Sequence, residues 1–235
     1  MKKLFSLGLG VGLLLTALSI QPTSVATAQS AGLVSSLFTR MEKNQRSLKT
    51  LSASITMWKY NAQLRDEDKY QGIVLYIPGA AGASSAFVRL EWTSPQHEIL
   101  AVQNGNYSLF RPRLLTVVEG KTGSIKSSKD SDVLALMGMS ATQLRTKFGE
   151  TQDVREETLS GGVHTTHFKV FPKTAANYKY IELWVDDGGM PVQTKMVEKN
   201  DDATTVRLTN VEKNQTIPKD QFKLNLDSNV KRVKG

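Results

Sequence analysis

The chain has 235 residues, no cysteine and three histidines, and its formal net charge is +8 at pH 7. Without cysteine there is no disulfide framework, no thiolate metal site and no residue for N-terminal lipid attachment. The lysines and arginines are scattered rather than clustered, which favours a solvated basic surface over a nucleic-acid site. A modest basic excess also suits acidic partners or an anionic membrane surface.

The first 28 residues have the layout of a secretory signal peptide. Lys2 and Lys3 precede an uncharged apolar run over 4–20, and Ala26-Thr27-Ala28 is a small-x-small cleavage site. The alternative is a membrane anchor, because the run approaches the roughly 20 residues that span a bilayer. The Gly and Ser interruptions and the cleavage pattern favour removal of residues 1–28, which leaves 29–235 as a single exported domain.

An amphipathic helix is predicted over 32–49. Its apolar residues recur with helical spacing, and the charged residues lie elsewhere on the helix. The apolar set is Leu33, Val34, Leu37, Phe38, Met41 and Leu48. The simplest role for this face is packing against a core.

From Leu51 onward the apolar residues alternate with a period of two, which is typical of strands with one buried face. The charged run 65–69 is predicted to turn the chain after the first strand, and Asn104-Gly105 to form a hairpin turn. Eleven strands are expected, over 51–57, 70–77, 87–93, 98–103, 107–110, 114–118, 153–159, 163–171, 178–185, 192–199 and 204–212.

The strand pattern stops in the middle of the chain, where two short helices are predicted over 130–138 and 141–148. Ser140 is placed to cap the second helix, and Gln143 completes a capping box. A single turn over 217–222 precedes an extended tail. The fold class is therefore mainly β (α+β), with helices at the N-terminus and in the centre.

Nothing in the sequence nominates an enzyme or a cofactor. His164 and His167 are three apart in a predicted strand, so they point to opposite faces and are a poor metal pair. The Asp pairs at 186–187 and 201–202 lie in predicted hairpin turns, where Asp is favoured for its conformation. No nucleophile elbow and no zinc-protease motif is present.

Three segments resemble the periplasmic outer-membrane lipoprotein carrier family. The first is 48–56, after the first helix. The second is Val88-Arg89-Leu90-Glu91-Trp92-Thr93-Ser94-Pro95 with 99–105, which is similar to the family's Arg-Trp-x-Tyr-x-x-Pro and Ile-Val-x-Asp-Gly. The third is 181–189, followed by 205–210 and 217–222. The order and spacing of the segments carry the resemblance, which extends over nearly all of the mature chain.

The resemblance implies an incomplete antiparallel β-barrel wrapped over helices, with an apolar cavity that binds the acyl chains of a lipoprotein. It implies a periplasmic monomer that takes cargo from an inner-membrane exporter to an outer-membrane receptor. With strand parity, it gives these expected cavity residues: Leu37, Phe38, Met41, Leu51, Ile55, Val88, Leu90, Trp92, Leu100, Val102 and Met137.

One departure from the family pattern concerns closure of the cavity. The family's typical carriers place an Arg just before the Pro that ends the second strand, where it helps to latch a helical lid. Here Ile77 precedes Pro78, and the following loop is longer and rich in Gly and Ala. This predicts a different closure and leaves other cargo open, such as a glycolipid or a phospholipid. A lipid-sensing regulator, a structural envelope protein and an exported hydrolase are the competing functions.

Overall fold

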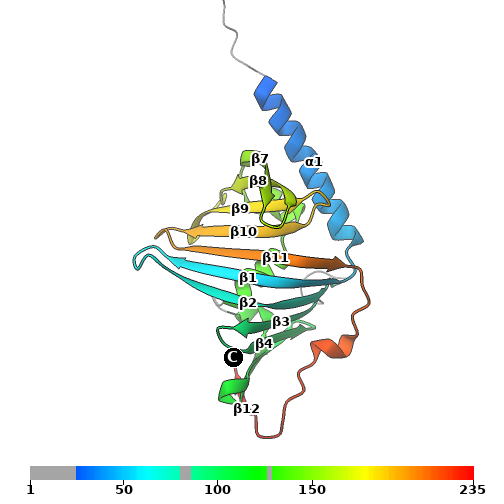
Figure 1. Ribbon diagram of the computed structural model, residues 1–235, viewed down its shortest axis with the longest axis vertical. Coiled ribbons are helices and arrows are strands. Elements are labelled where there is room, and N and C mark those ends of the chain that lie inside the picture. Colours follow the sequence, from blue (N-terminus) through cyan, green and yellow to red (C-terminus); the bar gives the residue numbers. More distant parts are fainter. Residues whose placement is uncertain (1–24, 80–85, 126–128) are drawn as a thin grey trace, which may run out of the picture.

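The computed structural model describes residues 25–79, 86–125 and 129–235. In this part of the chain twelve strands form one open sheet, in the order β12-β6-β5-β4-β3-β2-β1-β11-β10-β9-β8-β7. Figure 1 shows the strands stacked from β7 at the top to β12 at the bottom, with α1 running diagonally down the right-hand side of the upper strands. The sheet does not close on itself, as predicted for an incomplete barrel.

Three α-helices accompany the sheet in the described residues. They are α1 (Val25–Ser47), α2 (Lys129–Met137) and α3 (Ala141–Lys147). The Ser140 hydroxyl accepts a hydrogen bond from the Gln143 amide at 3.1 Å, so the predicted cap of α3 is confirmed. The first helix begins at Val25 rather than at Gly32, and Leu33 on its predicted apolar face is 47% exposed. No helix described here has the length and apolarity needed to cross a membrane.

All eleven predicted strands are present, and a twelfth joins them. The bounds are β1 (Leu51–Asn61), β2 (Asp66–Ile77), β3 (Phe87–Ser94), β4 (Glu98–Gln103), β5 (Asn106–Arg111), β6 (Thr116–Lys121), β7 (Gln152–Leu159), β8 (Val163–Val170), β9 (Tyr178–Asp186), β10 (Pro191–Glu198), β11 (Ala203–Lys213) and β12 (Lys231–Lys234).

Three details of the strand prediction are wrong. Leu114 and Leu115, the start of the predicted strand 114–118, lie in a 3-10 turn and its C-cap, so β6 begins at Thr116. Residues 66–69 belong to β2 rather than to a turn, because β1 and β2 stay paired as far as Asn61 and Asp66. The turn is set by Asn61, whose side-chain oxygen accepts from the amides of Gln63 and Leu64. The extended tail also contains β12, which pairs in parallel with β6, so the sheet is not wholly antiparallel.

The sheet is covered on both faces over its lower half. In β1 buried and half-buried residues alternate from Leu51 to Trp58, as expected for a strand with one face in the core. In β4, by contrast, residues 98–102 are all buried. The helix α2 packs on the concave face, and the C-terminal tail covers the convex face through Phe222, whose ring lies 5.8 Å from that of Phe87.

The turn between β9 and β10 lies directly against α1. Gly189 has a φ of +85°, and a Cβ built there would lie 2.3 Å from the carbonyl carbon and oxygen of Arg40. Only a residue without a side chain allows the turn and the helix to approach this closely. Gly189 therefore fixes the position of α1 on the upper half of the sheet.

We expect Gly189→Ala to destabilise the protein more than Gly161→Ala. Gly161 also has a positive φ, +84°, but has open space around its Cβ position. In the control Gly161→Ala, the free energy of unfolding should fall by about 1 kcal/mol because of the left-handed backbone alone. In Gly189→Ala it should fall by about 1–3 kcal/mol more because the added methyl group overpacks the site. Urea unfolding measures both values. Equal losses in the two variants would contradict this close packing.

Candidate functional site

The concave face of the sheet is an apolar surface that α2 covers, and it extends over β1, β3 and β4 and continues onto β10 and β11. Seven of the eleven predicted cavity residues lie here, and each is 3% exposed or less: Leu51, Ile55, Val88, Leu90, Trp92, Leu100 and Val102. They form one cluster with Val133 of α2, which is itself fully buried. The strand parity that placed them on one face is therefore correct, and in this state the surface they form is occupied by the protein's own helix.

A group of polar contacts holds the N-terminal half of α2 to the sheet. The Trp92 Nε1–H donates to Asp130 Oδ1 at 2.8 Å, and both side chains are buried. Lys129 pairs with the buried Glu98, and Lys59 Nζ lies 3.2 Å from Asp132 Oδ2. We call these three contacts, Trp92–Asp130, Glu98–Lys129 and Lys59–Asp132, the α2 clasp.

The carboxyls of the clasp are perturbed by their burial. Burial raises the pKa of Asp130, and the Trp92 hydrogen bond and the Lys129 charge only partly offset this effect. Burial also raises the pKa of Asp132, against the opposite pull of Lys59. Burying a carboxylate costs free energy that its partners must offset, so the clasp is a costly way of holding a helix compared with apolar packing.

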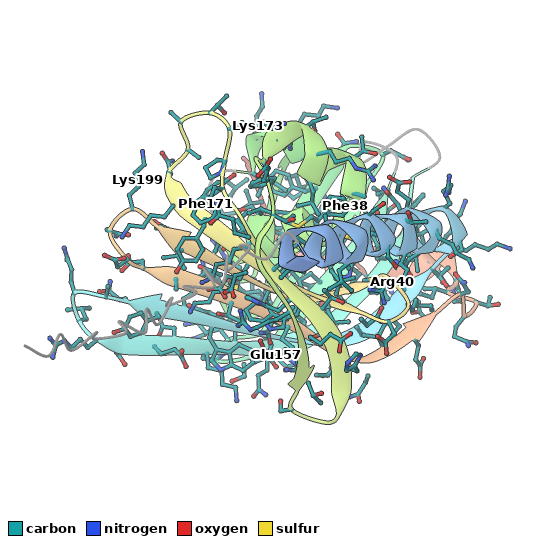
Figure 2. The ribbon with its side chains drawn as sticks, turned by 90° about the horizontal axis from the view of Figure 1, so that it is seen from above. Phe38, Arg40, Glu157, Phe171, Lys173 and Lys199 are labelled. Atoms are coloured by element: carbon teal, nitrogen blue, oxygen red, sulfur yellow. The ribbon has the colours of Figure 1, made fainter. Side chains whose placement is uncertain are left out.

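The other three described residues of the predicted set lie on α1 and join a second cluster on the upper half of the sheet. Leu37, Phe38 and Met41 pack against α3 and against buried residues of β8 and β9. Figure 2 shows Phe38 on the side of α1 that faces the central helices. Phe38 and Val34 line an open groove of about 830 Å³, with Arg145 and Lys173 also among its lining residues.

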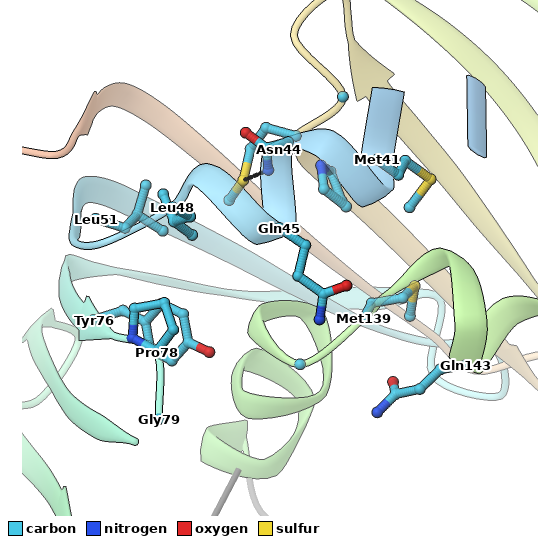
Figure 3. A pocket seen from close by; sticks show the side chains of 14 residues that line it. Met41, Asn44, Gln45, Leu48, Leu51, Tyr76, Pro78, Gly79, Met139 and Gln143 are labelled. Atoms are coloured by element: carbon cyan, nitrogen blue, oxygen red, sulfur yellow. Dashed lines mark hydrogen bonds between the residues drawn. The ribbon is translucent and has the colours of Figure 1, made fainter. Parts of the chain in front are cut away.

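A smaller pocket of about 280 Å³ lies where the two clusters meet (Figure 3). One wall is formed by Met41 of α1, Leu48 just after this helix and Leu51 of β1. Tyr76 and Met139 face them. Asn44, Gln45 and Gln143 add amide groups to the lining. Ligand sites for small molecules usually measure about 300–1,000 Å³, so this pocket alone is too small to hold a whole acyl chain.

The predicted residues are thus divided among three places. Seven lie under α2, three lie on α1, and Met137 ends α2 with a side chain outside the described part of the structure. Of the set, only Met41 and Leu51 line the 280 Å³ pocket. Tyr76 was not predicted, although it lines this pocket from β2, and neither was the clasp, whose partners are far apart in the chain.

The contact that holds α1 differs from the latch implied by the family pattern. Ile77, at the place of the family's Arg, pairs with Phe87 in the sheet and carries no charge. Instead Arg40 of α1 donates to Thr166 Oγ1 at 3.2 Å and to the Asp187 carbonyl at 3.4 Å. Arg40 lies on the side of the helix away from Phe38 (Figure 2). The helix is therefore fixed to β8 and to the β9–β10 turn.

The sequence model described as outer membrane lipoprotein carrier protein LolA matches residues 86–225. The chain belongs to this family. The match includes β3, β4, the clasp residues of α2 and the β9–β10 turn. Members of the family are carriers or binding proteins for lipids or lipoproteins, and they are periplasmic or otherwise extracytoplasmic. No curated protein sequence matches the chain.

Solved structures share the fold at low sequence identity. An uncharacterized conserved protein from Thermus thermophilus is 12% identical with a TM-score of 0.53, over 88% of this chain and 100% of that one. MucB is 12% identical with a TM-score of 0.51, over 84% of this chain and 63% of that one. The Pseudomonas aeruginosa MucA/MucB structure is 15% identical with a TM-score of 0.48, over 82% of this chain and 61% of that one. The chain thus spans less than two thirds of MucB.

The raised pKa of Asp130 predicts a pH dependence of stability. The folded protein holds this proton more tightly than the unfolded chain, so the free energy of unfolding falls as pH rises from the ordinary carboxyl range through the raised pKa. Asp130→Asn cannot ionise, and its oxygen can still accept from Trp92. We expect a flatter pH slope in urea unfolding, whereas Asp227→Asn, at an exposed carboxyl, should keep the wild-type slope. An unchanged slope in Asp130→Asn would contradict the assignment.

Proposed function

We propose that this protein is a periplasmic carrier that binds the acyl chains of a lipoprotein on the concave face of its sheet. The observation that carries the proposal is the filling of that face by α2. A helix of nine residues packs on the apolar surface. Its position is defined by the buried Trp92–Asp130 bond, by the Glu98–Lys129 ion pair and by the partly exposed Lys59–Asp132 ion pair, in addition to apolar packing.

The energetics suit an exchange between the helix and a lipid. Each acyl CH2 group that leaves water gains about 0.8 kcal/mol, so one acyl chain can replace the apolar contacts of Val133 and its neighbours. Breaking the clasp returns Asp130, Asp132 and Glu98 to water, which recovers their hydration. Cargo binding and helix release then differ little in free energy, as a reversible carrier requires.

The lining of the pocket also suits a flexible apolar ligand. Met41, Met139 and Met190 line the pocket between the two halves of the sheet. Methionine is unbranched and adapts its shape to irregular neighbours. In this proposal the acyl chain enters at this pocket and passes under α2 toward Leu90 and Trp92.

The place of the protein in the cell follows from the same proposal. Residues 1–28 direct export and are removed, and the remaining chain works as a monomer without a cofactor or catalytic residue. An inner-membrane exporter loads the acylated lipoprotein, and an outer-membrane receptor accepts it. The family membership and the apolar concave face support this route.

Tethering α2 tests whether the helix must move. The chain has no cysteine of its own, so Lys59→Cys with Asp132→Cys can be bridged by a bis-methanethiosulfonate reagent. We expect uptake of a fluorescent fatty acid to fall to background in the bridged protein and to return after reduction. Each single-cysteine variant treated with the same reagent is the control. Undiminished uptake in the bridged protein would contradict the proposal that lipid replaces α2 on this face.

The cargo can be identified by native mass spectrometry of the protein purified from the periplasm, together with extraction and analysis of the bound lipid. We expect a bound acylated lipoprotein. A glycolipid or phospholipid would keep the acyl-binding site but assign the carrier to another lipid pathway. Recovery of a bound membrane protein without acylated cargo would replace carriage by sensing.

A further inference from the structure

Two leucines are exposed where β5 turns into β6. Leu114 is 64% exposed and Leu115 is 47% exposed, on a short 3-10 turn, Pro112–Leu114, at the end of β5. Lys231 at the start of β12 donates its amide to the Leu115 carbonyl at 2.8 Å, so the C-terminal strand supports the turn. The turn therefore lies beside the start of β12, at the lower end of the molecule in Figure 1.

The backbone at this turn makes a leucine an unfavourable choice. Leu115 has a φ of 45° and a ψ of 43°, in the left-handed region that favours Gly and Asn. An exposed apolar side chain there contributes nothing to the core. Its presence in a strained, solvent-facing position indicates a role outside the fold.

The charge around the leucines is strongly positive. Residues 111–121 and 227–235 together carry six basic and two acidic side chains. One of the acids, Glu119, is paired with Arg232 at 2.7 Å. Arg113 precedes the leucines in the chain, and Lys231 lies beside them on β12. Both are exposed, and neither forms an ion pair within the described part of the structure.

We propose that Arg113, Leu114, Leu115 and Lys231, the basic tip, dock the protein on an anionic phospholipid surface. The leucines enter the boundary between headgroups and acyl chains, and the two cations contact lipid phosphates. A protein partner would need a flat complementary surface, whereas two adjacent leucines flanked by cations match a bilayer interface. The inference goes beyond lipid carriage, since it concerns how the protein meets a membrane.

The tip lies close to the clasp that seats α2. Arg111, which ends β5 just before the tip, has its Nε 3.0 Å from Glu98 Oε1, and Glu98 also holds Lys129 of α2. Docking through the basic tip thus places the membrane near the Glu98–Lys129 ion pair that holds α2 to the sheet. Leu64, which is 75% exposed, lies elsewhere, in the β1–β2 turn. It is followed by Arg65 and then by the acidic run Asp66-Glu67-Asp68, whose net negative charge an anionic surface repels.

Flotation with protein-free vesicles tests the basic tip. We expect the wild type to bind vesicles of phosphatidylcholine and phosphatidylglycerol, and to bind pure phosphatidylcholine weakly. Leu114→Ser with Leu115→Ser should weaken binding by about tenfold through lost apolar burial. Arg113→Gln with Lys231→Gln should weaken it by about tenfold and reduce its salt dependence. Leu64→Ser is the matched control and should bind as the wild type does.

A second variant separates docking from folding. Leu115→Asn suits the left-handed backbone, so we expect its thermal midpoint to equal or exceed that of the wild type while vesicle binding falls. The proposal is overturned if the wild type does not float with anionic vesicles. It is also overturned if the double serine variant binds undiminished or if Leu64→Ser weakens binding equally. Uptake of the fatty-acid probe is a separate readout and can persist in either case.

Discussion

The structure depends on covering the concave face of one strongly curved apolar sheet. Seven buried positions on β1, β3 and β4 present large side chains to this face, and leaving them in water would cost about 1.5–3 kcal/mol for each large side chain. A twisted open sheet cannot cover its own inner face. The short helix α2 meets this need from the protein itself, and in the proposed function an acyl chain takes its place.

The contacts that position α2 fix this helix at one place on the sheet without binding it permanently. Apolar packing alone fixes a helix only loosely, because neighbouring positions on an apolar surface are nearly equivalent. The bonds from Trp92 to Asp130 and from Lys59 to Asp132 select one position. Trp92 and Asp130 are buried, whereas Lys59 and Asp132 are partly exposed. The buried bond costs hydration, so it adds specificity while contributing little net stability. In the proposed function, a helix held in this way is well placed but can be displaced.

Local periodicity was sufficient to predict most of the strands and which residues share a face, because the alternation from Leu51 and from Val88 is a property of each strand alone. The family resemblance, not the periodicity, placed that face inside. What it could not give is the occupant of that face. Asp130 reads as an ordinary residue of a helix start, and only the fold brings it to Trp92, 38 residues away. The same holds for β12, whose exposed, basic residues have no strand pattern and which pairs only because β6 offers a free edge.

The charges on α1 and α2 divide the molecule into a fixed and a releasable half. On α1, Arg40 reaches the β9–β10 turn, and Gly189 allows backbone contact that leaves no room for a side chain. This close packing resists displacement. On α2 the corresponding contacts are ion pairs and one indole hydrogen bond, which water and anionic headgroups can replace. Glu98 is shared between Lys129 of α2 and Arg111 beside the basic tip. In the proposed docking, an anionic surface near that tip would compete for Arg111 and disturb the charge balance of the clasp. One buried carboxylate would then link release of the helix to the approach to a membrane.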